Sequence, residues 1–198
     1  MSAVAKTLGG RLALIAPGEL SSSQEKLYDH IQDTLVPWAK KSGFQAETDD
    51  KELIGPFNPM LRSPEIATAL LGVTSAEQKH TSLSEKVRQV IILTTGAVWQ
   101  AGYELYAHAA VADKTGFDEE TIQALVAGQK PASLSEDEAL AHDFTYHLVA
   151  THQINPDLYR RAIEAFEEKG VFDLIALAGQ YMSISALLNA FAVPVPAE

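Results

Sequence analysis

Glu104 and His108 lie four residues apart in the segment Tyr103–His108, and both side chains are of types that move protons. On a helix, residues at this spacing project from one face, one turn apart. A carboxylate beside an imidazole raises the pKa of the imidazole and fixes its tautomer, an arrangement that general acid/base catalysis uses. The spacing therefore predicts either a proton-transfer pair or two ligands of a metal site.

Spacing alone does not single out this pair, because most acid–histidine pairs at this distance are solvated contacts on a helix surface. The surroundings differ, however. The segment around Glu104 and His108 is rich in aromatic and small residues, and burial of an acid and a histidine is costly unless they are paired. We therefore interpret this pair as catalytic and the other pairs as part of a solvated face. The other two pairs are Glu138 with His142 and Asp143 with His147.

Other chemistries find less support in the sequence. No third ligand stands at a recognised spacing from Glu104 and His108, so no metal site is predicted. The chain contains no cysteine, which excludes disulfides, thiolate zinc sites and cysteine nucleophiles. No glycine-rich phosphate loop follows a strand, and no Gly-x-Ser-x-Gly motif occurs.

The composition is that of an ordinary globular protein. The chain has 198 residues, of which 46% are hydrophobic and 21% charged, and its net charge is -11. This length suits one domain, and the negative charge argues against binding to nucleic acid or to anionic membrane surfaces. The apolar run near the N-terminus is too short for a signal peptide. We expect a cytoplasmic protein without nucleic-acid or membrane partners.

The elements that must position the pair are helices. We expect an extended arm over residues 1–21 and one all-α domain of about eight helices over residues 22–198. Capping signals predict the helix starts. They are Ser22, Ser63-Pro64-Glu65, Ser84-Glu85, Asp118-Glu119-Glu120, Ser135-Glu136 and Asn155-Pro156.

Breaking signals predict where helices end. Pro37 should end or kink the first helix, and residues 42–60 read as a stiff loop of the kind that lines pockets. Gly96 should break the helix that starts at Ser84, before a second helix over residues 99–115 that carries the pair. The last helix, over residues 171–191, is apolar nearly all round and should lie centrally or at a subunit interface.

Several segments, in order, resemble the carboxymuconolactone decarboxylase family of the AhpD-like superfamily. The resemblance covers most of the chain. It is carried by GPFN at residues 55–58, by WQAGYELYAHAAVADKTG at residues 99–116, by DEAL at residues 137–140 and by LNAF at residues 188–191.

The resemblance implies an AhpD-like helical domain, a homo-oligomer between dimer and hexamer, and a pocket beside the helix that bears His108. The peroxidase branch of the family carries two cysteines and an upstream glutamate. Their positions correspond here to Ala101, Glu104 and, on or near it, Gln89. A peroxide-reducing cycle needs thiols, so we expect no thiol peroxidase activity from this chain.

The decarboxylase branch needs no cofactor, and the resemblance implies a lyase that acts on a small organic acid or lactone. His108 would be the general acid/base and Glu104 its orienting partner. Arg62 or Arg88 could anchor a substrate carboxylate, although both also read as surface arginines. The alternative is a non-catalytic, oligomeric ligand-binding protein. We assign substrate binding to Phe57, Asn58, Arg62, Trp99 and Tyr103.

Overall fold

The chain folds into α-helices joined by short loops, as a computed structural model that describes residues 8–197 shows. Within that range no strand occurs beyond one isolated bridge between Glu47 and Leu53. The expectation of an all-α domain of about eight helices is confirmed. The helices are α2 (Ser22–Ser42), α3 (Phe57–Met60), α4 (Pro64–His80), α5 (Glu85–Trp99), α6 (Gly102–Lys114), α7 (Glu119–Val126), α8 (Glu136–Tyr146) and α9 (Pro156–Ala190), with short turns η1 (Pro17–Glu19) and η2 (His147–Thr151).

Most helices begin where the capping signals place them. The side chains of Ser84, Asp118 and Asn155 accept hydrogen bonds from backbone N–H groups in the first turns of α5, α7 and α9. Ser135 forms a full capping box at the start of α8. These side chains satisfy donors that have no partner inside the helix, so the starts are encoded locally.

Two sequence predictions about the first third of the chain were wrong in part, since Pro37 does not end the first helix and the segment 42–60 contains helical residues. Pro37 lies inside α2, which continues to Ser42. Pro37 lies on the exposed face of that helix, where water can satisfy the carbonyl that loses its hydrogen bond. The segment 42–60 is not entirely loop, because its last four residues form the buried helix α3.

The prediction that Gly96 breaks α5 was also wrong. The helix continues through Gly96 to Trp99 and ends at Gln100, which has a left-handed conformation with φ 52°. A Cβ atom on Gly96 would lie 3.2 Å from Leu105 Cδ2 and 3.5 Å from Glu104 Cγ. The glycine therefore lets α5 and α6 approach closely, and α6 starts at Gly102 rather than at residue 99.

Helix α9 bends at Glu167, which has φ 58° and ψ 176°. This lies close to the boundary predicted between the helix from Asn155 and the apolar last helix. By length and mean hydropathy (1.6) α9 could span a membrane. Its buried residues, however, pack against α5 and α8, as those of a core helix do.

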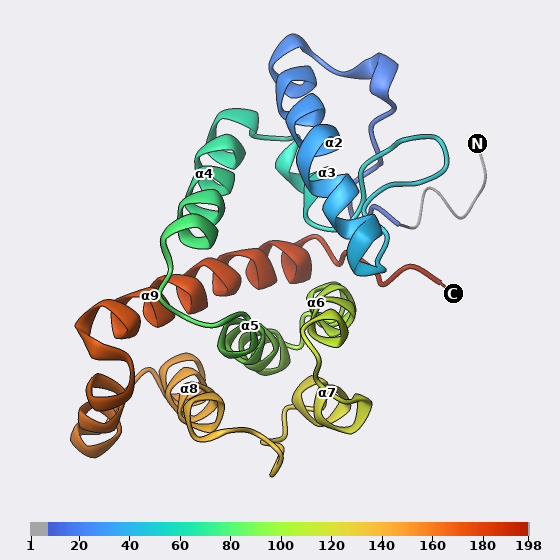
Figure 1. Cartoon of the computed structure of the whole chain (residues 1–198). Helices are drawn as coiled ribbons and strands as arrows, with labels where there is room; N and C mark the ends of the chain where they lie inside the picture. Colours follow the sequence, from blue (N-terminus) through green and yellow to red (C-terminus); the bar gives the residue numbers. More distant parts are fainter. Residues whose placement is uncertain (1–7, 198) are drawn as a thin grey trace.

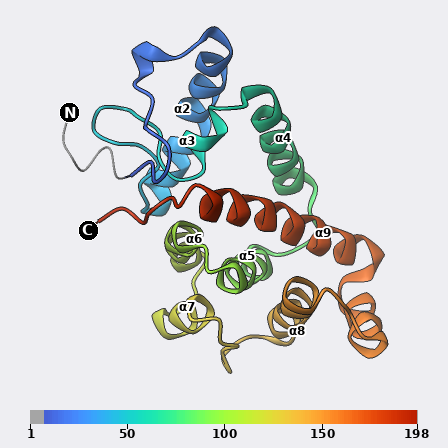
Figure 2. The same cartoon turned by 180° about the vertical axis from the view of Figure 1, so that it is seen from behind.

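The second half of α9 runs through the middle of the molecule (Figures 1 and 2). On one side of it lie α2, α3 and α4, and on the other side lie α5, α6, α7 and α8. Helix α5 packs against α6, α7, α8 and α9. Helix α6, which carries Glu104 and His108, packs against α2, α5, α7 and α9. Both α5 and α6 are thus fixed by contacts with several other helices.

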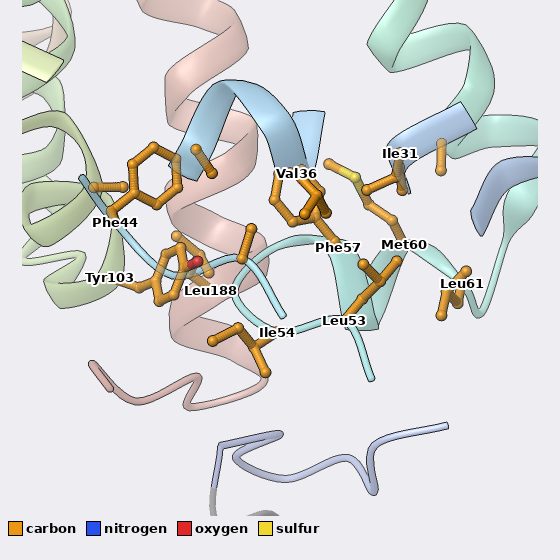
Figure 3. Close-up of a cluster of buried hydrophobic side chains, with 14 of the residues drawn as sticks. Ile31, Val36, Phe44, Leu53, Ile54, Phe57, Met60, Leu61, Tyr103 and Leu188 are labelled. Carbon is orange, nitrogen blue, oxygen red and sulfur yellow. The ribbon is translucent and has the colours of Figure 1, made fainter. Parts of the chain in front are cut away.

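One cluster of buried hydrophobic residues joins α2, α3 and α6 to the loop before α3. Figure 3 shows part of this cluster, in which Tyr103 and Leu188 lie beside Phe44 and Ile54. Leu8, Leu14, Ile15 and Leu20 from the predicted N-terminal arm pack partly buried against it. The arm is therefore attached to the domain over residues 8–21, and residues 1–7 of the predicted arm lie outside the described residues.

Candidate functional site

Glu104 and His108 form a buried pair on α6, which we call the dyad. Glu104 Oε1 lies 3.2 Å from His108 Nε2, and the two residues are only 4% and 5% exposed. At Gly96, helix α5 packs closely against the part of α6 that carries Glu104. The helical spacing thus brings acid and imidazole together, as expected from the sequence.

Gln89 on α5 holds the other side of the imidazole. Its Oε1 lies 2.8 Å from His108 Nδ1, and its own Nε2 donates to Glu85 Oε1 at 2.8 Å. Because the amide nitrogen of Gln89 is directed to Glu85, its oxygen faces His108, and Nδ1 must donate. The proton of a neutral imidazole then lies on Nδ1, and Nε2 presents its lone pair to Glu104.

Burial favours the uncharged form of both members of the dyad. It raises the pKa of Glu104 to about 8. Burial, and to a lesser extent the positive charge of Arg88, lowers the pKa of His108 to about 3. Near neutral pH the dyad therefore holds one proton between the Glu104 carboxyl and His108 Nε2, and it carries no net charge.

The dyad faces a small cavity of about 70 Å³. Aromatic rings surround the imidazole: Tyr181 meets it edge-on, with ring centroids 5.0 Å apart, and Trp38 lies 6.2 Å away. The lining comes from α2, α3, α4, α6, α9 and the loop before α3. It comprises Leu35, Trp38, Phe44, Pro56, Phe57, Met60, Leu71, Thr74, Gln78, Tyr103, Glu104, Ala107, His108, Tyr181 and Ile184.

Tyr103 forms a fixed wall of this cavity. The Tyr103 hydroxyl donates a hydrogen bond to the carbonyl oxygen of Gln45. The backbone N–H of Gln45 in turn donates to the hydroxyl of Tyr106. Gly55 has φ 63°, and a Cβ atom there would overlap the Tyr103 ring. The loop before α3 therefore needs glycine at this position to pack on Tyr103.

The residues assigned to substrate binding separate into two groups. Phe57 and Tyr103 line the cavity. Asn58 and Arg62 instead hold the N-terminal arm, since their side-chain nitrogens reach the carbonyl oxygen of Ala13 at 3.4 and 2.5 Å. Trp99 is 37% exposed at the end of α5 and lies outside the cavity lining.

Arg88, the other residue considered as a carboxylate anchor, is buried and already paired. Its guanidinium contacts Glu77 Oε1 at 3.0 Å and Oε2 at 2.6 Å, and it also pairs with Glu85. Two carboxylates thus occupy the donors of Arg88, and it does not line the cavity. Neither arginine considered for this role lines the cavity.

Residue reasoning alone missed several groups around the dyad. Trp38 and Tyr181 are far from His108 in sequence, and no local pattern links them to it. Gln89 was marked only by the family resemblance. An apolar setting predicted a buried dyad, but the identity of its neighbours depends on how α2, α5 and α9 pack.

The other acid–histidine pairs serve structural contacts. Glu138 closes the capping box of α8, and Asp143 binds Lys130 at 2.7 Å. His142, expected on a solvated face, is buried because this side of α8 faces the core. Among residues 8–197, no group of three or more metal-ligating side chains is found.

Solved structures share this architecture. An uncharacterized peroxidase-related protein from Silicibacter sp. TM1040 superposes with a TM-score of 0.72 at 17% identity, covering 96% of this chain and 93% of that one. A second peroxidase-related protein, from Ralstonia eutropha JMP134 and with an alkylhydroperoxidase AhpD core, superposes with a TM-score of 0.73 at 17% identity, covering 93% of this chain and 91% of that one. The debrominase Bmp8 in complex with 2,3,4-tribromopyrrole gives 0.69 at 14%, covering 94% and 93%.

At these identities the likeness defines the fold, which is that of the AhpD-like proteins. No protein of curated function matches the sequence. Residues 64–144, which include α4, α5, α6 and the dyad, match the carboxymuconolactone decarboxylase family. The likeness to that family at the level of sequence covers residues 64–144, and the chain contains no cysteine.

Proposed function

We propose that this protein is a cofactor-free enzyme of the decarboxylase or lyase type, which acts on a small organic acid or lactone by proton transfer. One observation carries the proposal: Glu104 and His108, 3.2 Å apart and buried, both line a small cavity with aromatic walls. Burial keeps a carboxylic acid protonated beside an imidazole base near neutral pH. A matched acid and base of this kind is what general acid/base catalysis requires.

The absence of cysteine separates this proposal from the redox chemistry of the superfamily. A thiol peroxidase needs a thiolate nucleophile and a resolving thiol. Glu104 stands where the resemblance places one of these thiols, and Ala101 stands in the place of the other. A carboxyl group there can accept and donate protons, but it cannot form a disulfide.

The test is replacement of His108 by Gln, with turnover followed on a panel of small lactones and organic acids in D₂O. We expect loss of product formation and of solvent deuterium uptake, while circular dichroism and thermal unfolding still report a folded protein. His30→Gln is the control, since His30 is exposed on α2. Full activity of His108→Gln would contradict the proposal.

The second candidate function is ligand binding without catalysis. It is favoured by one observation: the polar atoms of the dyad already satisfy each other and Gln89, and the cavity is only about 70 Å³. Thermal-shift screening followed by product analysis separates the two candidates. Ligands that raise the melting temperature and are recovered unchanged would support binding alone.

We further propose that the protein works as a homo-oligomer. Helix α4 has 17 residues but buries only Ala67, and its residues Ile66 and Val73 are 65% and 51% exposed. An exposed apolar stripe of this kind is typical of an interface. Light scattering should give a multiple of the 21.4 kDa chain mass, and Ile66→Glu with Val73→Glu should lower it. A monomeric native protein would contradict this proposal.

A further inference from the structure

We infer that the dyad acts on a substrate bound as a neutral molecule, namely a small unsaturated lactone or cyclic ketone, rather than on a carboxylate anion. The inference rests on the proton transfer that the proposed function assigns to the dyad. It selects the lactone over the organic acid as substrate, and isomerisation over decarboxylation as the reaction. It follows from the charges at the cavity, from the protonation of the dyad and from the chemistry that a neutral acid and base can perform.

The cavity wall carries no formal positive charge. Among the described residues that line it, the polar groups are the dyad, two tyrosine hydroxyls and the neutral side chains of Thr74 and Gln78. Burial raises the pKa of both Tyr103 and Tyr181, so their hydroxyls stay protonated. Trp38 adds an uncharged indole N–H, and the remaining lining is apolar. A carboxylate would therefore enter without a cation to pair with, at a high desolvation cost.

The nearby cation does not change this balance. Arg88 lies close enough to lower the pKa of His108, but it is paired with both Glu77 and Glu85. One positive and two negative charges leave this cluster net negative, and the whole chain carries a net charge of -11. An anion would therefore find no unpaired cation at the site, whereas a neutral ring gains from burial against aromatic side chains.

A neutral carbonyl compound fits the protonation state of the dyad. Glu104 can donate its proton to the carbonyl oxygen while His108 Nε2 removes a proton from the adjacent carbon. The C–H bond breaks, an O–H bond forms, and the product is a neutral enol beside a carboxylate–imidazolium pair. Return of a proton to another carbon, and of the hydroxyl proton to Glu104, gives the isomer and restores the dyad. No oxidant, reductant or cofactor is consumed.

The size of the cavity sets a condition on binding. A cavity that holds benzene has a volume of about 150 Å³, which is larger than the 70 Å³ found here. The cavity must therefore widen to admit a ring. Leu71, Thr74 and Gln78 of α4 form one wall, and α4 is the helix that buries a single residue. We expect displacement of α4 around Leu71 and Thr74 to widen the cavity, because the dyad lies on another helix, α6.

The experiment compares two probes with five carbons each, the neutral α-angelica lactone and the anionic 4-oxopentanoate. Proton NMR in D₂O follows isomerisation of the lactone to its conjugated isomer and deuterium uptake, and titration of protein signals measures binding. We expect binding and enzyme-dependent isomerisation of the lactone, and at least about tenfold weaker binding of the anion. Equal or tighter binding of 4-oxopentanoate would overturn the inference.

A designed cation at the cavity mouth provides the matched control. Gln78 is exposed and lines the cavity, so Gln78→Arg adds a positive charge there and Gln78→Met adds none. We expect Gln78→Arg, but not Gln78→Met, to gain affinity for 4-oxopentanoate. Failure of the arginine variant to gain affinity would show that charge does not set the preference.

The outcomes distinguish this inference from the proposed function. Binding of the lactone without isomerisation or deuterium uptake in the native protein supports the neutral class and contradicts catalysis. Deuterium uptake into 4-oxopentanoate, lost in His108→Gln, supports catalysis and overturns the neutral class. Absence of binding of either probe, with a folded protein, counts against the inference.

Discussion

Arg88 and Glu77 form a buried two-point ion pair that joins α5 to α4. The guanidinium meets both carboxylate oxygens, at 3.0 and 2.6 Å, and the two side chains are 10% and 7% exposed. Arg88 also binds Glu85, which in turn accepts a hydrogen bond from Gln89. The attachment of α4 is thereby connected, contact by contact, to the residue that orients His108.

Replacement of Arg88 by Met should destabilise the protein by about 3 kcal/mol, because it leaves the buried carboxylate of Glu77 without a partner. Urea denaturation followed by circular dichroism measures the change. Arg160→Met is the matched control. Arg160 also pairs with two acids, but its side chain is 58% exposed and solvent screens the pairs, so we expect a much smaller loss. Equal losses in the two variants would refute a special role of burial.

The dyad should shape the dependence of stability on pH. The pKa of His108 is about 3 in the folded protein against 6.5 ordinarily, so the unfolded chain binds more protons in that window and stability rises with pH. The pKa of Glu104 is about 8 against 4.5 ordinarily, so the folded protein binds more protons there and stability falls with pH. The two contributions cancel where the windows overlap, from pH 4.5 to 6.5.

Above that plateau the Glu104 contribution acts alone. We expect the free energy of unfolding of the native protein to fall between pH 6.5 and 8 relative to that of Glu104→Gln, by up to about 1.4 kcal/mol per pH unit. Urea titrations of both proteins at several pH values measure this difference. Parallel curves over the window would show that Glu104 is ionised in the folded protein.

Gln89 should act as a positioning residue through the tautomer of His108. Gln89→Leu removes the acceptor of the Nδ1 proton, which costs about 1–3 kcal/mol for a buried group and weakens the preference for this tautomer. Nitrogen-15 NMR of the imidazole reports which nitrogen is protonated, independently of activity. Gln89→Glu keeps an acceptor and should retain the native tautomer. An unchanged spectrum in Gln89→Leu would exclude this role.

Gly55 and Gly72 should respond in opposite directions to replacement by Ala. At Gly55 the left-handed backbone and the overlap with the Tyr103 ring should cost about 2 kcal/mol or more. Gly72 lies inside α4 with no atom within 4 Å of an added Cβ, so alanine should stabilise by about 0.5–1 kcal/mol. Thermal melts of the two variants check the signs.

The bend of α9 predicts a further contrast. Glu167 is exposed and has a backbone conformation that glycine adopts far more easily. Glu167→Gly should therefore stabilise the protein by about 1 kcal/mol. Glu168→Gly, at the next exposed position, should destabilise it by about as much, because glycine is unfavourable in regular helix. Chemical denaturation measures the change in unfolding free energy of each variant. A loss of stability in both variants would show that residue 167 is in regular helix in solution and would contradict this prediction.

The helix starts could be predicted because their causes are local. Ser84, Asp118 and Asn155 cap the turn that directly follows them, and such contacts need nothing beyond the neighbouring sequence. The breaks were harder to predict. Whether Pro37 ends a helix depends on which face it occupies, and whether Gly96 interrupts α5 depends on how closely α6 packs against it. Both depend on tertiary structure.

The candidate site shows the same division. The pair Glu104 and His108 follows from helical spacing, and its burial follows from the apolar residues around it. The composition of the cavity wall does not follow from the local sequence, because Tyr181 lies more than seventy positions after His108 in the chain. Arg62 and Arg88 carry the charge that a substrate anchor needs, but only the packing shows that Ala13 and Glu77 occupy them.

The single buried residue of α4 has a consequence for how the native structure opens. Regions with few buried contacts unfold locally at a small fraction of the global free energy. In the dissociated chain, where no second copy covers α4, its amide hydrogens should then exchange with solvent far sooner than those of α5, ten of whose fifteen residues are buried. A wall of the cavity would thus open and close many times while the helices that carry Gln89, Glu104 and His108 stay intact.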